Sequence, residues 1–271
     1  MHRKNTVDAG TRMLNCRRQG AGPPLILLHG LFGSLTNWLA VGRRLAAHFS
    51  VYAVDLRNHG DSFHSTDCSL AAMAGDVRVF MAAHGLKRAT LVGHSLGGKV
   101  AMQFAASYPR QVTCLVVVDM APRAYAPALE DIFDGLLAVD LKSCGTLKDV
   151  VAALAEHIPD RMTRRFLAKN LARGSDGRLY WKINLPAMAA GRREVYRAVD
   201  IDHPIGCPAL FVRGEDSDHV TEDDRGPIRR LFPRSQVVSV PRAGHFVHID
   251  APKTFCRVLL DFLFEKCDDG G

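Results

Sequence analysis

Short apolar runs alternate with amphipathic stretches along the first part of the chain. Runs of this length without a charged residue are typical of strands buried on both faces; they occupy residues 25–28, 51–54, 89–92 and 112–118, with a further short strand expected over 13–18. Between them, apolar residues recur at helical spacing in 38–49 and 70–81. Strands and helices that alternate in this way form a parallel sheet covered on both sides. The pattern therefore predicts an α/β fold with a mostly parallel central sheet and helices on both faces.

This alternation stops after the strand at 112–118 and resumes near residue 206. The intervening segment contains helical patterns and no convincing strand; the helices are expected at 129–141, 147–157, 162–171 and 185–199. Strands then return at 209–212 and 236–240, with a helix around 224–231 and a final helix whose apolar face spans 255–263. A helical block inserted where a strand ends is expected to cover that edge of the sheet. We therefore expect a core formed by 1–121 and 206–271, with a helical cap formed by 122–205.

Length and composition favour one large domain with such an insertion. The chain has 271 residues, of which 47% are hydrophobic, and it lacks the uninterrupted apolar stretch of about 18 residues that crosses a membrane. Its N-terminus also lacks the apolar segment of a secretory signal. These features predict a soluble cytoplasmic protein without a membrane span. Residues 1–12 are basic, so the mitochondrial matrix is the alternative if the source is eukaryotic.

The sequence Gly93-His94-Ser95-Leu96-Gly97 joins the predicted strand at 89–92 to a predicted helix at 99–108. In this setting G-x-S-x-G is typical of a nucleophile elbow, where the glycines allow close backbone approach and the serine stands exposed above the sheet. Ser95 is therefore the candidate nucleophile. The same stretch also reads G-x-x-x-x-G-K, a phosphate-binding pattern, but Val100 stands where that loop needs a Ser or Thr ligand for magnesium.

His245 is the candidate general base, because it follows the last predicted strand in a glycine-containing turn. His248 lies three residues further on, but no third ligand is spaced near this pair, so no metal site is expected. Acyl transfer by a serine and a histidine needs no cofactor.

The carboxylate that would orient His245 has two candidate locations. Asp119 ends the strand after the elbow helix, whereas Asp216 and Asp218 follow the strand at 209–212. Either location would let a carboxylate hold the imidazole tautomer and stabilise its cation. We prefer Asp119, with Asp216 or Asp218 as the alternative acid.

An oxyanion hole requires two backbone N–H groups beside the nucleophile. Leu96 supplies one, because it follows the nucleophile, and Leu31 supplies the other, because it follows His29-Gly30 at the end of a predicted strand.

Several motifs together resemble the α/β-hydrolase superfamily and, within it, the YbfF-type esterases and their mitochondrial abhydrolase-domain relatives. The resemblance rests on residues 29–34, 55–62, 93–99, 119–122 and 243–245. It implies a serine esterase or thioesterase for short acyl groups, with Asp119 as the acid. The carboxylates Asp216 and Asp218 depart from that family's usual pattern.

We therefore expect a serine hydrolase that cleaves ester or thioester bonds of small acyl substrates through an acyl-enzyme on Ser95. One alternative is another triad-dependent reaction on the same fold, such as carbon–carbon bond hydrolysis or perhydrolysis, which a substrate panel would separate. The other is a non-catalytic receptor or scaffold. The presence of Ser95, His245 and both elbow glycines argues against the latter.

Charge adds one expectation about the substrate. Residues 160–197 contain ten Lys or Arg and three acids, an excess of +7 that equals the formal net charge of the whole chain. A basic cap would suit a substrate with an anionic handle, such as an acyl-coenzyme A thioester, although solvated helix faces explain the same charges. Few aromatic residues lie among these charges, so no nucleic-acid partner is expected. The sequence carries no indication of the oligomeric state.

Overall fold

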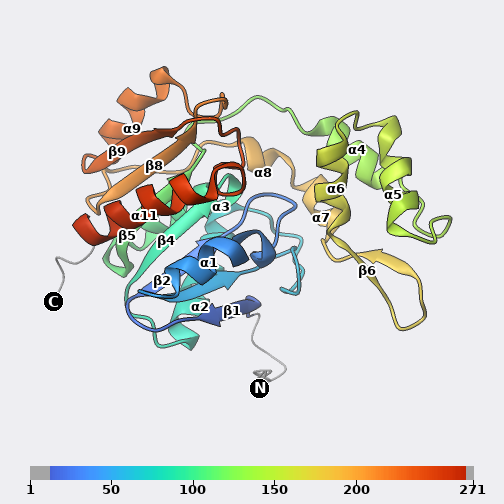
Figure 1. Cartoon of the computed structure of the whole chain (residues 1–271), viewed down its shortest axis with the longest axis horizontal. Helices are drawn as coiled ribbons and strands as arrows, with labels where there is room; N and C mark the ends of the chain where they lie inside the picture. The colour runs from blue at the N-terminus through green and yellow to red at the C-terminus, as the bar shows by residue number, and fades with distance from the viewer. Residues whose placement is uncertain (1–12, 267–271) are drawn as a thin grey trace.

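The computed structural model describes residues 13–266. Its main sheet has seven strands in the order β1-β3-β2-β4-β5-β8-β9 (Figure 1). The strands are β1 (Cys16–Gln19), β2 (Pro24–Leu28), β3 (Ser50–Val54), β4 (Ala89–His94), β5 (Val112–Val118), β8 (Ala209–Gly214) and β9 (Ser235–Val240). Only β1 runs antiparallel to its neighbour, and the other six strands are parallel. The predicted α/β fold with a mostly parallel sheet is confirmed.

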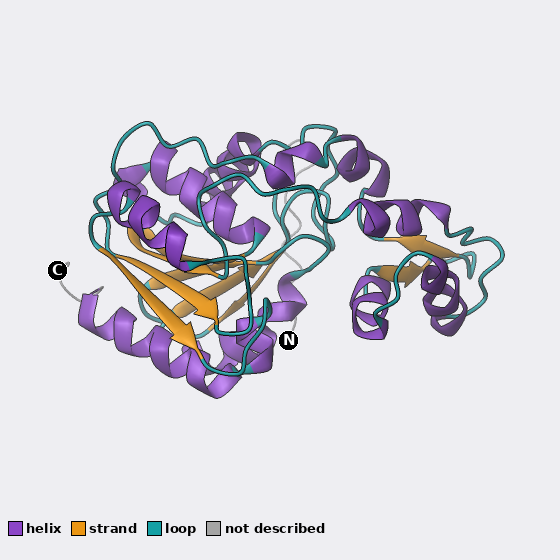
Figure 2. Ribbon diagram, turned by 90° about the horizontal axis from the view of Figure 1, so that it is seen from above, coloured by secondary structure: helices purple, strands orange, loops and turns teal. Residues whose placement is uncertain are grey.

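Two hydrophobic layers hold helices against the two faces of this sheet (Figure 2). Successive residues of a strand point to opposite faces, so Ile26 and Leu28 of β2 pack in one layer whereas Leu25 and Leu27 pack in the other. The first layer is covered by α2 (Leu70–Ala83) and α3 (Leu96–Ser107), and the second by α1 (Leu39–Leu45) and α11 (Pro252–Lys266). The helix α9 (Arg225–Leu231) and the single turn α10 (Val247–Asp250) complete the core. Burial on both sides explains why the central strands are uninterrupted apolar runs.

The insertion between β5 and β8 forms a lobe beside the sheet (Figures 1 and 2). It contains α4 (Glu130–Ala138), α5 (Leu147–Ala153), α6 (Arg161–Ala168), α7 (Leu185–Ala190) and α8 (Arg193–Tyr196). It also contains an antiparallel hairpin of β6 (Leu171–Arg173) and β7 (Leu179–Trp181). The prediction of an insertion without strands was therefore wrong. Three residues per strand are too few to show an alternating pattern in the sequence.

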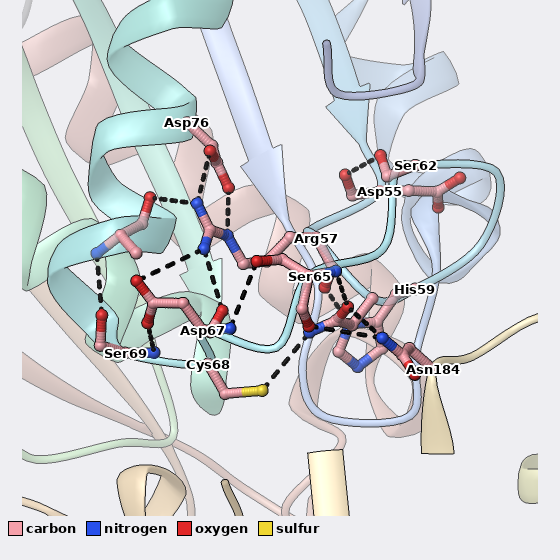
Figure 3. Close-up of polar contacts among 12 residues, drawn as sticks. Asp55, Arg57, His59, Ser62, Ser65, Asp67, Cys68, Ser69, Asp76 and Asn184 are labelled. Atoms are coloured by element: carbon pink, nitrogen blue, oxygen red, sulfur yellow. Dashed lines mark hydrogen bonds and ion pairs between the residues drawn. The ribbon is translucent and has the colours of Figure 1, made fainter. Parts of the chain in front are cut away.

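A polar loop over residues 55–65 connects the core to this lobe (Figure 3). Arg57 donates to both carboxylate oxygens of Asp76, at 2.5 and 2.7 Å, and fixes the loop to α2. On the lobe side, the Asn184 amide donates to Asn58 Oδ1 at 3.1 Å and its backbone N–H donates to the Asn58 carbonyl at 3.0 Å. The loop thus ties the lobe to the sheet.

Among residues 13–266, no helix combines the length and apolar character needed to cross a membrane. The basic segment 1–12, on which the expected alternative location depends, lies outside the described residues.

Candidate active site

Ser95 stands in a strained turn between β4 and α3. Its φ of 51° lies in the left-handed region, which is unfavourable for a residue with a side chain. Two glycines make the turn possible: a Cβ at Gly93 would lie 2.1 Å from the Gly97 carbonyl oxygen, and one at Gly97 would lie 2.3 Å from that of Leu28. Strain of this kind in a non-glycine residue clusters at functional sites. The elbow presents Ser95 at the carboxyl edge of the sheet.

His245 and Asp119 meet beside this elbow, although 126 residues separate them. The Nδ1 atom of His245 lies 2.8 Å from Asp119 Oδ2. Asp119 directly follows β5 and is fully buried, and it also accepts hydrogen bonds from the Gly214 N–H at 3.0 Å and from the Ser217 hydroxyl. A carboxylate at Nδ1 requires the proton there, which leaves Nε2 as the free acceptor.

The structure does not bring Asp216 or Asp218 to His245. Both are exposed, and the Asp218 side chain is 99% accessible. Asp218 instead faces His219, with 3.6 Å between its Oδ1 and the His219 Nδ1. Among the three carboxylates considered from the sequence, only Asp119 contacts the candidate base.

The two predicted oxyanion donors flank Ser95, the candidate nucleophile. Residues 30–33, here called the oxyanion loop, form a turn closed by a 3.0 Å hydrogen bond from the Gly33 N–H to the Gly30 carbonyl. A Cβ at Gly30 would lie 3.2 Å from Ser95 Cβ, so this backbone passes beside the nucleophile. Within residues 13–266 the Leu31 and Leu96 N–H groups and the Ser95 hydroxyl form no hydrogen bond. These polar groups remain available to a ligand.

Two further histidines, His94 and His219, contact His245. His94 is buried and donates from Nε2 to the His245 carbonyl at 2.8 Å; burial lowers its pKa well below the ordinary value. His219 stacks on His245, with ring centroids 3.8 Å apart and planes 20° apart. Burial and the neighbouring His245 lower the pKa of His219. The motif G-x-S-x-G accepts any residue at the position of His94, and His219 lies in a loop without hydrophobic periodicity. No sequence pattern therefore pointed to either residue.

A second pair of buried histidines supports the oxyanion loop. His59 Nε2 accepts from the Phe32 N–H at 3.2 Å, and His29 Nε2 accepts from the Leu56 N–H at 3.0 Å. Burial lowers the pKa of His29 to about 4 and that of His59 to about 3. Both rings are therefore neutral acceptors at neutral pH. In the sequence, both histidines lie within motifs that carry the family resemblance, at residues 29–34 and 55–62.

His248 does not form a metal-binding pair with His245. Its ring stacks on Trp38, with centroids 4.2 Å apart, and burial lowers its pKa to about 3. Asp119, His219 and His245 do place one ligand atom each within 4.8 Å of one another. However, His245 Nδ1 already lies at hydrogen-bond distance, 2.8 Å, from Asp119 Oδ2, so a proton rather than a metal ion accounts for this contact.

The family model described as "alpha/beta hydrolase fold" matches residues 23–252. The chain belongs to the α/β-hydrolase family. This hydrolase is 36% identical over 252 residues to the "sn-1-specific diacylglycerol lipase ABHD11" of Mus musculus, covering 89% of this chain and 81% of the relative. It is 32% identical over 259 residues to "Esterase YbfF" of Escherichia coli, covering 92% and 98%. A solved "Marine microorganism esterase" has a TM-score of 0.91 at 38% identity and covers 93% of this chain and 100% of that one. The resemblance inferred from the motifs is confirmed.

Proposed function

We propose that this hydrolase is a serine esterase, with Ser95 as nucleophile, His245 as general base and Asp119 as the acid that orients it. The observation that carries the proposal is the 2.8 Å contact between His245 Nδ1 and buried Asp119, made beside a serine held at φ 51°. Relatives named esterase and lipase support the same reaction class. The triad order Ser, Asp, His along the chain is typical of this fold.

The reaction divides into acylation and deacylation. His245 Nε2 takes the Ser95 hydroxyl proton while Ser95 Oγ bonds to the ester carbonyl carbon, and the Leu31 and Leu96 N–H groups stabilise the resulting oxyanion. The bond from carbon to the leaving oxygen then breaks, and the His245 imidazolium gives its proton to the departing alcohol. Water repeats both steps on the acyl-enzyme and releases the carboxylic acid and free Ser95.

Aromatic side chains from the core and the inserted lobe surround this machinery. Phe246 lies next to His245, with ring centroids 5.5 Å apart, and contacts Phe166 of α6 at 5.3 Å. Phe32 of the oxyanion loop packs on Phe133 of α4 at 5.1 Å. We propose that the lobe of residues 122–205 is a cap, and that these rings form an apolar roof suited to small acyl groups.

Covalent labelling by a fluorophosphonate probe tests the proposal. The unmodified protein is expected to label at Ser95, and Ser95→Ala is expected to abolish labelling because the probe requires an activated serine. Ser239→Ala, an exposed serine of β9, is the matched control and should label normally. Absence of labelling in the unmodified protein, or equal labelling of Ser95→Ala, would contradict a serine hydrolase.

We further propose that the substrates include thioesters with an anionic group, such as acyl-coenzyme A. Within the described residues Arg161, Arg165 and Lys169 are exposed and form no ion pair. The two arginines lie with Phe166 on α6, and Lys169 directly follows this helix. Changing Arg161 and Arg165 to Ala is expected to raise the KM for acetyl-coenzyme A about tenfold, because long-range attraction to the phosphates is lost. The same change should leave KM for p-nitrophenyl acetate, which is neutral, within twofold.

The matched control removes two exposed arginines, Arg229 and Arg230, from α9 of the core. If that double variant raises the thioester KM as much as the α6 variant does, the effect reflects net charge. The proposal that α6 attracts the anionic group of the substrate would then fail.

A further inference from the structure

The oxyanion loop, like the elbow at Ser95, contains a residue in an unfavourable backbone conformation. Phe32 has φ 57°, whereas Leu31 is not among the residues with positive φ. A four-residue turn with positive φ only at its third residue has type II geometry, and glycine is the usual residue at that place. A phenylalanine there would relax toward negative φ unless contacts held it, because left-handed geometry crowds its Cβ.

Two buried side chains hold the backbone of Phe32 from opposite directions. His59, from the core, accepts from the Phe32 N–H at 3.2 Å. Asn170, from the insertion, donates from Nδ2 to the Phe32 carbonyl at 2.8 Å, across 138 residues of sequence. The same Nδ2 donates to the Leu167 carbonyl at 3.1 Å, which fixes the orientation of the amide. Asn170 is only 5% exposed, so water does not compete freely for these contacts.

The position of Asn170 links the oxyanion loop to the rest of the lobe. Asn170 lies two residues after the end of α6, and Phe166 of α6 contacts Phe246 beside His245. On the other side of Phe32, His59 is held from the core, because its Nδ1 donates to the Arg57 carbonyl at 2.9 Å. The Asn184 contact to Asn58 ties the lobe to the same core loop (Figure 3). The Asn170 hydrogen bond to Phe32 is therefore the one that depends directly on the docked position of the lobe.

We propose that Asn170 is a positioning residue that keeps the oxyanion loop in its working conformation, so that the Leu31 donor is in place only while the lobe is docked. This inference rests on the proposed function and adds a role for the lobe in transition-state stabilisation. When the lobe moves away, the Phe32 carbonyl loses Asn170, the turn relaxes, and the Leu31 N–H no longer points at the oxyanion. Movement of the lobe, which admits the substrate, is thereby coupled to completion of the oxyanion hole.

Asn170→Asp tests the proposal, because it keeps the side-chain shape but replaces the donor NH₂ with an acceptor oxygen facing the Phe32 carbonyl. For p-nitrophenyl acetate, kcat per active site is expected to fall about 30- to 300-fold with KM within threefold, the signature of a misplaced oxyanion donor. Affinity for a trifluoromethyl ketone, which forms a tetrahedral oxyanion on Ser95, should fall by the same factor. Asn170→Ala removes the donor without adding a charge. It should also lower kcat, by about 30-fold, with KM within threefold.

Lys182→Met is the matched control. It removes a 2.6 Å ion pair to Asp61, another contact between the lobe and the same core loop, without touching Phe32. Its kcat and ketone affinity should stay within twofold of the unmodified protein. A general loss of lobe docking would instead lower activity in all three variants alike, and thermal unfolding measured in parallel reports any loss of stability.

Three results would overturn the inference: kcat within threefold for both Asn170 variants, unchanged ketone affinity, or an equal loss in Lys182→Met. An unmodified protein that neither hydrolyses the ester nor labels with fluorophosphonate would overturn the proposed function as well. An active unmodified protein with unaffected Asn170 variants would overturn the Asn170 role alone.

Discussion

Asp119→Asn is expected to lower kcat about 10⁴-fold, the loss typical of a triad whose histidine is held in the wrong tautomer. An amide at this position can present its NH₂ group to His245 Nδ1, which places the imidazole proton on Nε2, where the serine proton must be accepted. Asp119 is fully buried and its carboxylate also accepts from Gly214 and Ser217, so solvent cannot replace it. The double change Asp216→Asn/Asp218→Asn should leave kcat within threefold.

Steady-state ester hydrolysis, normalised by titration of active sites, measures both variants. Ser95→Ala sets the background rate. If Asp119→Asn keeps more than a tenth of the activity, or the double variant loses as much as Asp119→Asn does, the acid has been misassigned.

Acidification from pH 7 to pH 5 is expected to remove about 6 kcal/mol of folding stability through three buried histidines. Burial lowers the pKa values of His29, His59 and His248 to about 4, 3 and 3, whereas an unfolded histidine titrates near 6.5. Between these values the unfolded chain binds protons that the folded chain does not, so stability falls as the pH falls below about 6.5. At pH 5 each group costs about 2 kcal/mol. His94, whose pKa is also lowered, adds to the loss, which is large beside the 5–15 kcal/mol typical of a domain.

Urea unfolding at a series of pH values measures this effect. His248→Phe should reduce the pH slope by about one proton, because phenylalanine can keep the stack on Trp38 without titrating. His48→Phe, at an exposed position, is the control and should not reduce the slope. A urea midpoint that does not change between pH 7 and pH 5 would contradict neutral burial of these rings.

The sheet was predictable from the sequence because burial on both faces turns whole strands into apolar runs. Ser95 and His245 stood out as candidates for a related reason: each follows such a run at a glycine-containing turn. The sequence did not distinguish between the candidate acids, since Asp119, Asp216 and Asp218 all follow strands. Distinguishing them requires the path of the loop after β8, which places the Ser217 hydroxyl on Asp119.

The hairpin and the polar contacts between lobe and core could not be predicted. The strands β6 and β7 are too short for periodicity, and their pairing depends on a turn that includes Gly177 at φ 80°. Asn170 belongs to no sequence motif, and its partner is a backbone carbonyl 138 residues away. A backbone partner imposes no residue type, so it leaves no complementary signal in the sequence.

The connection of the lobe to the sheet makes the geometry of the proposed triad independent of the inserted segment. The chain leaves the sheet after Asp119 and returns at β8, whose Gly214 N–H is hydrogen-bonded to that same carboxylate. Outgoing and returning segments are joined by the Val199 N–H to the Pro122 carbonyl at 2.8 Å. A different lobe inserted at the same place would therefore leave the proposed nucleophile, base and acid in position, but it would have to supply its own partner for the Phe32 carbonyl.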